Sequence, residues 1–153
     1  MEDYFLQKSI NEAKIAQSKG EVPVGVVIVK DNKIISTGYN TKEYTKDPTN
    51  HAEIIAIKKA TKIIGDWRLS ECDMYVTLEP CTMCAGAIVQ SRIRRLYIGT
   101  FDPRAGGCGS VFNITQSEYL NHWVDIKWLY NDECSDLLQE FFKRRRREKD
   151  KGK

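Results

Sequence analysis

The chain has 153 residues, of which 41% are apolar and 29% are charged, a size and composition typical of one globular domain. These values exclude a disordered chain, and no stretch reaches the ~18 consecutive apolar residues of a membrane-spanning helix. The net charge of +3 is uneven, because residues 143–153 contain eight basic and two acidic side chains. We therefore interpret residues 1–147 as a single domain and residues 148–153 as a basic C-terminal tail.

The basic end has two interpretations, a solvated end or a segment that binds phosphate, and the rest of the chain must decide between them. At the other end, Glu2 and Asp3 lead directly into a helical pattern, which is unlike a targeting peptide. The cysteines are odd in number, which favours reduced thiols over a disulfide framework and predicts a cytoplasmic protein. There are five of them: Cys72, Cys81, Cys84, Cys108 and Cys134.

The first part of the chain predicts a helix, a hairpin and a second helix. Apolar residues recur at helical spacing over residues 3–19. Residues 24–29 and 34–38 are rich in β-branched side chains and are separated by a polar turn, which is typical of a β-hairpin. A polar loop is expected over residues 39–49, followed by a helix over residues 50–62.

The second part alternates predicted strands and helices. Three strands are expected, at residues 74–78, 95–99 and 124–129, with a helix from Pro80 to about Ser91, a Gly-rich loop at 101–110 and a last helix from Asp132. This element order predicts an α/β fold. Its form is a three-layer α-β-α sandwich, in which a mixed five-stranded sheet has helices on both faces.

Two short motifs contain residues suited to chemistry: His51-Ala52-Glu53 and Pro80-Cys81-Thr82-Met83-Cys84. Each has an ordinary explanation when it is taken alone. Asn50 and Glu53 have the spacing of a helix capping box. A Cys-x-x-Cys pair is also found in redox proteins and in structural zinc sites, although neither a thioredoxin-like context nor a second Cys/His pair is visible here.

Taken together, the motifs indicate a catalytic zinc site. One imidazole and two thiolates provide three ligands, and a catalytic site leaves the fourth position to water. A structural site would need a fourth protein ligand. Glu53 lies too close to His51 in sequence to be that ligand, but it is well placed to exchange protons with the water.

The two motifs resemble those of the zinc nucleoside and nucleobase deaminase superfamily. From about residue 3 to residue 147 the chain also resembles the bacterial tRNA-specific adenosine deaminases. The basic ending after two phenylalanines is the feature that points to this branch. The matching segments are residues 21–25, 38–40, 77–81, 83–87 and 141–146, with Asp102 in the Gly-rich loop.

This resemblance implies a cytidine deaminase-like fold and the hydrolytic conversion of adenosine to inosine at the wobble position of a tRNA anticodon loop. His51, Cys81 and Cys84 would hold one Zn²⁺ per subunit. Water activated by the zinc and by Glu53 would attack C6 of the base, and ammonia would leave. The implied partner is the tRNA anticodon stem-loop, and the implied assembly is a homodimer.

The resemblance also implies substrate contacts. Asn40, Val24 and Asp102 match positions near the target nucleoside, with a turn asparagine, a core valine and a loop aspartate as the ordinary alternatives. We expect Phe141 to face the core. The expected RNA-facing residues of the last helix are Phe142, Arg144 and Arg145. Asn50 departs from the small apolar residue that the family has before the histidine.

Two other classes of function remain open at this point. A deaminase of free guanine, free cytosine or a nucleoside would share the zinc residues, but it is expected to lack the basic last helix. A non-enzymatic RNA-binding module would hold zinc structurally, and it would need a fourth protein ligand.

Overall fold

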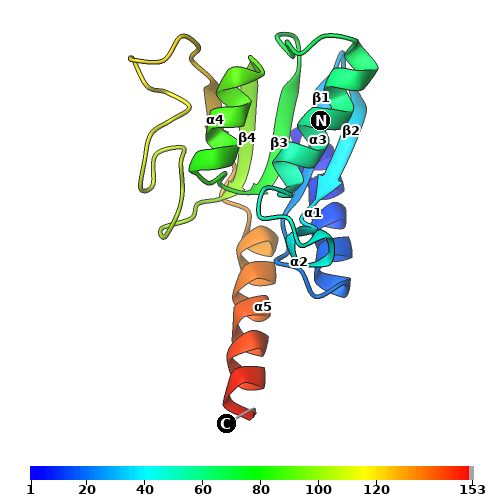
Figure 1. The fold of residues 1–153 in the computed structure, drawn as a ribbon, viewed down its shortest axis with the longest axis vertical. Helices are drawn as coiled ribbons and strands as arrows, with labels where there is room; N and C mark the ends of the chain where they lie inside the picture. Colours follow the sequence, from blue (N-terminus) through cyan, green and yellow to red (C-terminus); the bar gives the residue numbers. More distant parts are fainter. Residues whose placement is uncertain (152–153) are drawn as a thin grey trace.

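The computed structural model describes residues 1–151, which form one sheet with helices packed against it (Figure 1). Periodic apolar residues and flanking turn residues produce most of the elements where the sequence predicts them. In chain order they are α1 (Glu2–Ser18), β1 (Gly25–Lys30), β2 (Lys33–Tyr39), α2 (Lys42–Thr45), α3 (Ala52–Ile64), β3 (Asp73–Leu78), α4 (Thr82–Gln90), β4 (Arg95–Thr100), β5 (Asp125–Trp128) and α5 (Asp132–Lys151).

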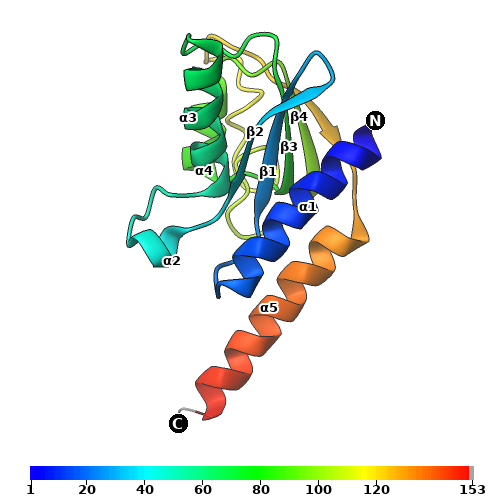
Figure 2. The same ribbon diagram turned by 90° about the vertical axis from the view of Figure 1, so that its right-hand side faces the viewer.

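The sheet is mixed, with the strand order β2-β1-β3-β4-β5. β1 pairs antiparallel with β2 and with β3, whereas β3, β4 and β5 are parallel to one another. Figure 2 shows α3 and α4 on one face of the sheet and α1 on the other. The predicted three-layer α-β-α sandwich is therefore confirmed.

Each face of the sheet buries its own apolar cluster. β1 contributes to both clusters, because successive side chains of a strand point to opposite faces. Val26 and Ile28 pack on the side of α3 and α4, whereas Val27 and Val29 pack with Phe5 of α1. The sheet is thus a rigid base for the segments that extend from its edges.

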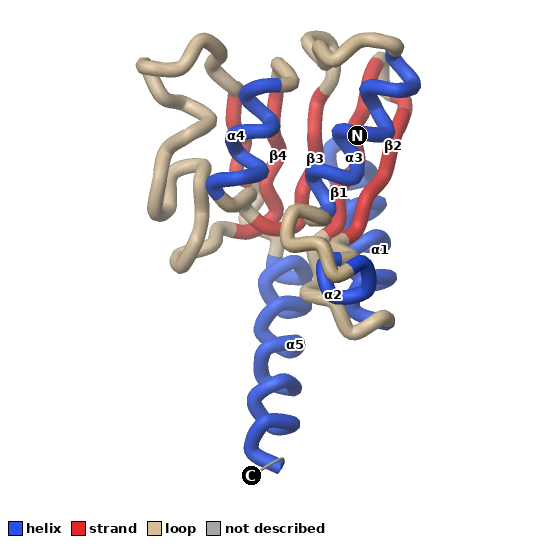
Figure 3. The backbone as a smooth tube through the Cα atoms, viewed as in Figure 1, coloured by secondary structure: helices blue, strands red, loops and turns tan. Residues whose placement is uncertain are grey.

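One edge of the sheet gathers the segments that contain the chemical motifs. The parallel strands β3 and β4 end there, at Leu78 and Thr100. Because β2 runs antiparallel to β1, Tyr39 at the end of β2 pairs with Gly25 at the start of β1 at this same edge. Ligands of α/β proteins bind where parallel strands end, so this edge is the expected place for a site. α5 begins there as well and projects away from the sheet (Figure 3).

Three local predictions need correction. The predicted loop 39–49 contains the short helix α2. The predicted helix 50–62 begins later, since α3 starts at Ala52 with His51 as its N-cap, and the capping box considered as an alternative for Asn50 and Glu53 does not form. The side-chain amide of Asn50 instead donates to the hydroxyls of Thr41 at 2.8 Å and Thr45 at 3.1 Å. These bonds connect the start of α3 to the α2 segment.

The basic end of the chain continues a helix and is not an irregular tail. α5 runs without interruption through Arg147 to Lys151, so the predicted boundary at residues 147 and 148 lies inside it, and whether 148–153 act as a separate tail stays a prediction. Residues 152–153 lie outside the described part. Within residues 1–151, none of the helices has the length and hydropathy needed to cross a membrane.

Candidate active site

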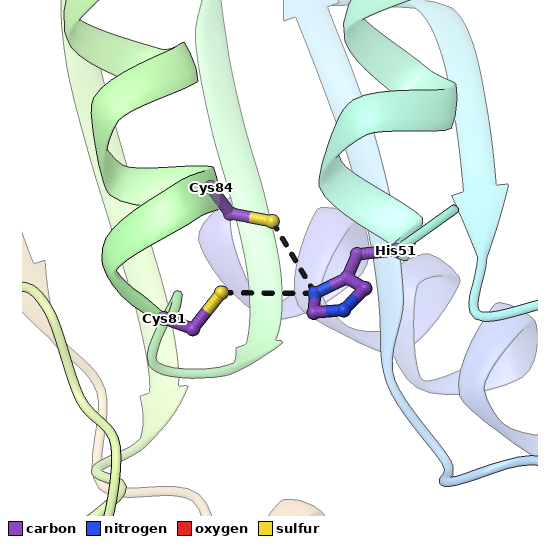
Figure 4. A group of neighbouring side chains, drawn as sticks. All are labelled: His51, Cys81 and Cys84. Atoms are coloured by element: carbon purple, nitrogen blue, oxygen red, sulfur yellow. Dashed lines mark hydrogen bonds between the residues drawn. The ribbon is translucent and has the colours of Figure 1, made fainter. Parts of the chain in front are cut away.

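The predicted ligands meet where two helices begin. His51 is the N-cap of α3, Cys81 is the N-cap of α4, and Cys84 lies in the first turn of α4. His51 Nδ1 lies 3.7 Å from Cys81 Sγ and 3.5 Å from Cys84 Sγ, and the possible ligand atoms of the three residues all lie within 4.8 Å of one another (Figure 4). Residues 30 positions apart in sequence thus form one compact group.

The spacing of these atoms fits a zinc ion. Zinc binds sulfur at about 2.3 Å and nitrogen at about 2.0 Å, so a tetrahedral site separates two such ligand atoms by roughly 3.6 Å. The observed separations agree with that value. In the described chain, the group that could hold a metal consists of these three residues, without a fourth His, Cys, Asp or Glu. The donor set therefore matches a catalytic zinc site better than a closed structural one.

The electrostatics of this corner favour a thiolate at Cys81. A hydrogen bond from Cys84 lowers the pKa of Cys81 to about 4 and raises that of Cys84. The same Cys81 sulfur raises the pKa of His51 through its hydrogen bond to the ring. Both cysteines also lie at the positive end of the α4 dipole, which stabilises thiolates.

Glu53 lies beside the ligands but is not one of them. It sits in the first turn of α3 and is 4% exposed. This burial raises the pKa of its carboxyl group to about 7. A carboxyl group that titrates near neutral pH can both accept and donate a proton under working conditions. We call His51, Glu53, Cys81 and Cys84 the metal corner.

Asn40 and Val24 lie at the same edge of the sheet and contact each other through the backbone. The Asn40 amide N–H donates to the Val24 carbonyl at 3.2 Å. The Asn40 side chain accepts from Lys42 N at 3.1 Å and donates to Val22 O at 3.4 Å, while Val24 packs against the core. These are the contacts of a turn asparagine and a core valine, so their roles toward a substrate remain predictions.

Asp102 opens the loop that follows β4. Its carboxylate accepts from Arg104 N at 2.9 Å and Ala105 N at 3.3 Å, as a turn-forming aspartate does. The loop and α5 together border a groove of about 980 Å³. Asp102 and Phe142 both line this groove, so the structure brings two of the predicted substrate residues to one surface.

Of the RNA-facing residues predicted in α5, Phe142 lines the groove but Arg144 and Arg145 do not. Phe142 is 37% exposed whereas Phe141 is 7% exposed, which confirms the expected core position of Phe141. Arg144 pairs with Glu140 at 3.2 Å, and Arg145 lies over the Phe141 ring at 5.0 Å. Neither arginine lines the groove, which instead receives Lys143 and Arg146. Helical spacing from Gln139 and Phe142 could have indicated these two residues.

The structural roles of two buried carboxylates were not predicted from the sequence. Glu21, 1% exposed, accepts from Glu43 N at 2.9 Å and Tyr44 N at 2.8 Å and so holds α2 in place. Glu79, 2% exposed, accepts hydrogen bonds from the loop after β4. We call loops 40–50 and 101–110, together with the groove-lining face of α5, the substrate wall, after the role predicted for Asn40, Asp102 and Phe142.

The fold and the ligand set define a deaminase, and a comparison with protein families agrees. The family described as MafB19-like deaminase matches residues 2–146. Its match therefore includes the metal corner, the substrate wall and most of α5.

Comparisons with individual proteins identify the family more narrowly. The tRNA-specific adenosine deaminase of Aquifex aeolicus (strain VF5) is 50% identical over 144 residues, which are 94% of this chain and 95% of that protein. The tRNA-specific adenosine deaminase of Bacillus subtilis (strain 168) is 40% identical over 149 residues, with 97% and 92% covered. The chain belongs to the tRNA-specific adenosine deaminase family.

Comparison with solved structures also finds deaminases. A structure from a study of A-to-I editing by tRNA:A34 deaminases at the wobble position has a TM-score of 0.85 and 39% identity, and it covers 89% of this chain and 99% of its own. The guanine deaminase of Bacillus subtilis has a TM-score of 0.62 and 39% identity but covers only 65% and 64%. The structure from the tRNA:A34 study thus agrees with this chain over nearly its whole length, whereas the guanine deaminase of Bacillus subtilis agrees over about two thirds of it.

Proposed function

We propose that this protein converts adenosine to inosine at the wobble position of a tRNA anticodon loop by zinc-dependent hydrolysis. The supporting observation is that the metal corner and a groove bordered by basic residues of α5 lie at one edge of the sheet. The two relatives that are 50% and 40% identical over nearly the whole chain are named for tRNA and not for a free base. This favours the tRNA reaction over the deamination of free guanine, free cytosine or a nucleoside.

The residues of the metal corner divide the chemistry between them. His51, Cys81 and Cys84 would hold the zinc, which would act as a Lewis acid and make a water molecule acidic near neutral pH. Glu53 accepts a proton from the water and delivers it to N1 of the adenine ring while the water oxygen bonds to C6. Glu53 then accepts the remaining proton of the hydroxyl group at C6 and delivers it to the amino group at C6. The C6–N bond breaks, and ammonia leaves with inosine as the product.

The groove explains why an unpaired loop is the substrate. In a helix the amino group at C6 is stacked and paired, whereas a loop nucleotide can be turned out into a site. Phe142 offers an aromatic ring for stacking. Lys143 and Arg146 on the groove, with Arg144 and Arg145 beside it, attract the phosphates. Asn40, Val24 and Asp102 would contact the target nucleoside.

The proposed assembly is a homodimer that acts in the cytoplasm, with one zinc ion per subunit. Large apolar side chains gather in the segment that follows loop 101–110. Exposed large apolar side chains that recur in one segment support a contact between proteins. The residues are Val111, Phe112, Tyr119, Leu120 and Trp123, each at least 43% exposed. Light scattering at working concentration measures the mass, and a monomer would contradict the assembly.

The deaminase assay uses two short RNA hairpins. One has adenosine at the wobble position of an anticodon loop, and the control has the same adenosine paired within the stem. Free guanine, cytosine and adenosine are assayed in parallel, with ammonia release as the common measurement. We expect inosine only in the loop hairpin. Ammonia released only from a free base would refute the proposed substrate.

A further inference from the structure

Glu79 is a buried carboxylate that the proposed chemistry does not use. It follows β3 directly and precedes the ligand Cys81 by two positions. Its side chain accepts four hydrogen bonds. The donors are Asp102 N at 2.9 Å and the Ser110 hydroxyl, both to Oε1, with Cys108 N at 3.0 Å and Ser110 N at 3.1 Å, both to Oε2.

All four donors come from a single segment, loop 101–110. Within residues 1–151 no lysine or arginine forms an ion pair with Glu79, so its charge is stabilised by backbone N–H groups and one hydroxyl. A buried carboxylate needs such donors, and hydrogen bonds to a charged acceptor are stronger than neutral ones. The loop is therefore folded around the carboxylate.

Two glycines provide the space for this arrangement. A Cβ atom on Gly106 would overlap the Glu79 carboxyl group, and one on Gly107 would lie 2.9 Å from the Cys81 carbonyl oxygen. Gly107 N also donates to Pro80 O at 2.7 Å. The loop is thus fastened to the same short segment that presents Cys81 to the metal corner.

The far side of this loop borders the groove of the substrate wall. Its groove-lining residues are Phe101, Asp102, Pro103, Arg104 and Ala105. Any change in the distance between Glu79 and the loop therefore moves these residues relative to Cys81. The carboxylate occupies the point where the ligand segment and the substrate wall are joined.

We propose that Glu79 is a positioning residue that fixes loop 101–110 against the metal corner and thereby sets the affinity for an RNA loop. The part that concerns RNA rests on the proposed function, whereas the part that concerns the loop does not.

The variant Glu79→Gln tests this role with little change in shape. Each carboxylate oxygen receives at least one backbone N–H, from Asp102 on one side and from Cys108 and Ser110 on the other. An amide NH₂ group faces a backbone N–H in either orientation, so at least one N–H loses its acceptor. Loss of a buried hydrogen bond to a charged group is expected to loosen the loop about tenfold.

The matched control is Glu21→Gln, which changes the other buried carboxylate of the substrate wall. Each oxygen of the Glu21 carboxylate accepts one hydrogen bond, Oε1 from Glu43 N and Oε2 from Tyr44 N. In hydrogen exchange, Glu79→Gln should speed the amides of Asp102, Cys108 and Ser110 about tenfold and leave residues 43 and 44 unchanged. Glu21→Gln should do the reverse. Equal exchange of the loop amides in Glu79→Gln and the parent protein would overturn the proposal.

Kinetics on the anticodon hairpin separates positioning from general support of the fold. For Glu79→Gln we expect KM to rise about tenfold, with kcat within about threefold and the zinc content unchanged. A fall in kcat together with loss of zinc at constant KM would assign Glu79 to the ligand geometry instead, and would overturn the proposed role.

A smaller substitution tests the same role if Glu79→Gln does not fold. Ser110→Ala removes only the hydroxyl donor. Amide exchange in loop 101–110 should become about threefold faster, and KM for the hairpin should rise about threefold. No shift in either quantity would overturn the proposal. If the parent protein deaminates no hairpin, the proposed function fails, while the exchange experiment still decides whether Glu79 holds the loop.

Discussion

The metal corner and the substrate wall lie at the same edge of the sheet, but they are built differently. The metal corner is made of side chains at the starts of α3 and α4, and these helices pack on the core through fully buried residues such as Ala52 and Ala85. The substrate wall is made of two loops and one face of α5. Its loops are held by the buried carboxylates Glu21 and Glu79.

This difference separates chemistry from recognition. Packed helix starts hold the metal ligands on the core of the protein. Loops tied by a few hydrogen bonds can differ more in shape than packed helices, which suits a surface that must fit a particular substrate. Changes in the metal corner should therefore abolish turnover at constant RNA affinity. Changes in the substrate wall should weaken RNA affinity at nearly constant turnover.

The largest effect is expected from Cys84→Ser. A neutral hydroxyl is a poor zinc ligand in place of a thiolate, so both the zinc content and the turnover should fall below detection. Elemental analysis measures the first and the inosine assay the second, while binding of the anticodon hairpin should change less than about twofold. The control is Cys72→Ala, a buried thiol outside the metal corner, which should keep its zinc. Full zinc in Cys84→Ser would contradict the assigned ligand set.

Glu53→Gln should separate proton transfer from metal binding within the metal corner. The amide cannot accept the proton from water, so kcat should fall by about 10³-fold while the zinc content stays at one per chain. Single-turnover kinetics with excess enzyme measures the chemical step directly. Near-normal turnover in this variant would refute the role of Glu53.

Gly106→Ala should affect the substrate wall and leave the metal corner intact. The new methyl group would overlap the Glu79 carboxyl group, so the loop must shift, at a cost of about 1–3 kcal/mol in the free energy of unfolding. KM for the hairpin should rise more than kcat falls. Gly86→Ala is the matched control, because its Cβ would meet no atom within 4 Å and alanine stabilises a helix interior by roughly 0.5–1 kcal/mol. Denaturant unfolding measures both free energies, and equal values would contradict the close approach at Gly106.

The metal corner could be predicted from the sequence because its information is local. His51 and Glu53 are two positions apart, and Cys81 and Cys84 are three positions apart, so short motifs contain the proposed ligands and the proposed proton-transfer group. The sheet could be predicted for a similar reason, since β-branched runs and helical periodicity identify each element separately.

The substrate wall could not be predicted in this way because its contacts are distant in sequence. Glu79 lies 23 to 31 positions from its donors, and Glu21 lies 22 positions from Glu43. The four-residue helix α2 has no periodicity of its own to detect and depends on Glu21. The contacts of Asn50 could not be predicted for the same reason, since its partners lie on the α2 segment and not in α3.

The smallest effect is expected from arginine substitutions in α5. They test which arginine faces the RNA. Arg146 lines the groove, whereas Arg144 is paired with Glu140 at 3.2 Å and lies outside it. Each phosphate contact that is lost reduces the slope of log K against log salt by about 0.7 to 0.9. Arg146→Gln should lower the slope for hairpin binding by about that amount, and Arg144→Gln by less. Titrations at several salt concentrations measure both slopes. A larger decrease for Arg144→Gln would place the RNA on the other face of α5 and would move the substrate wall away from the groove.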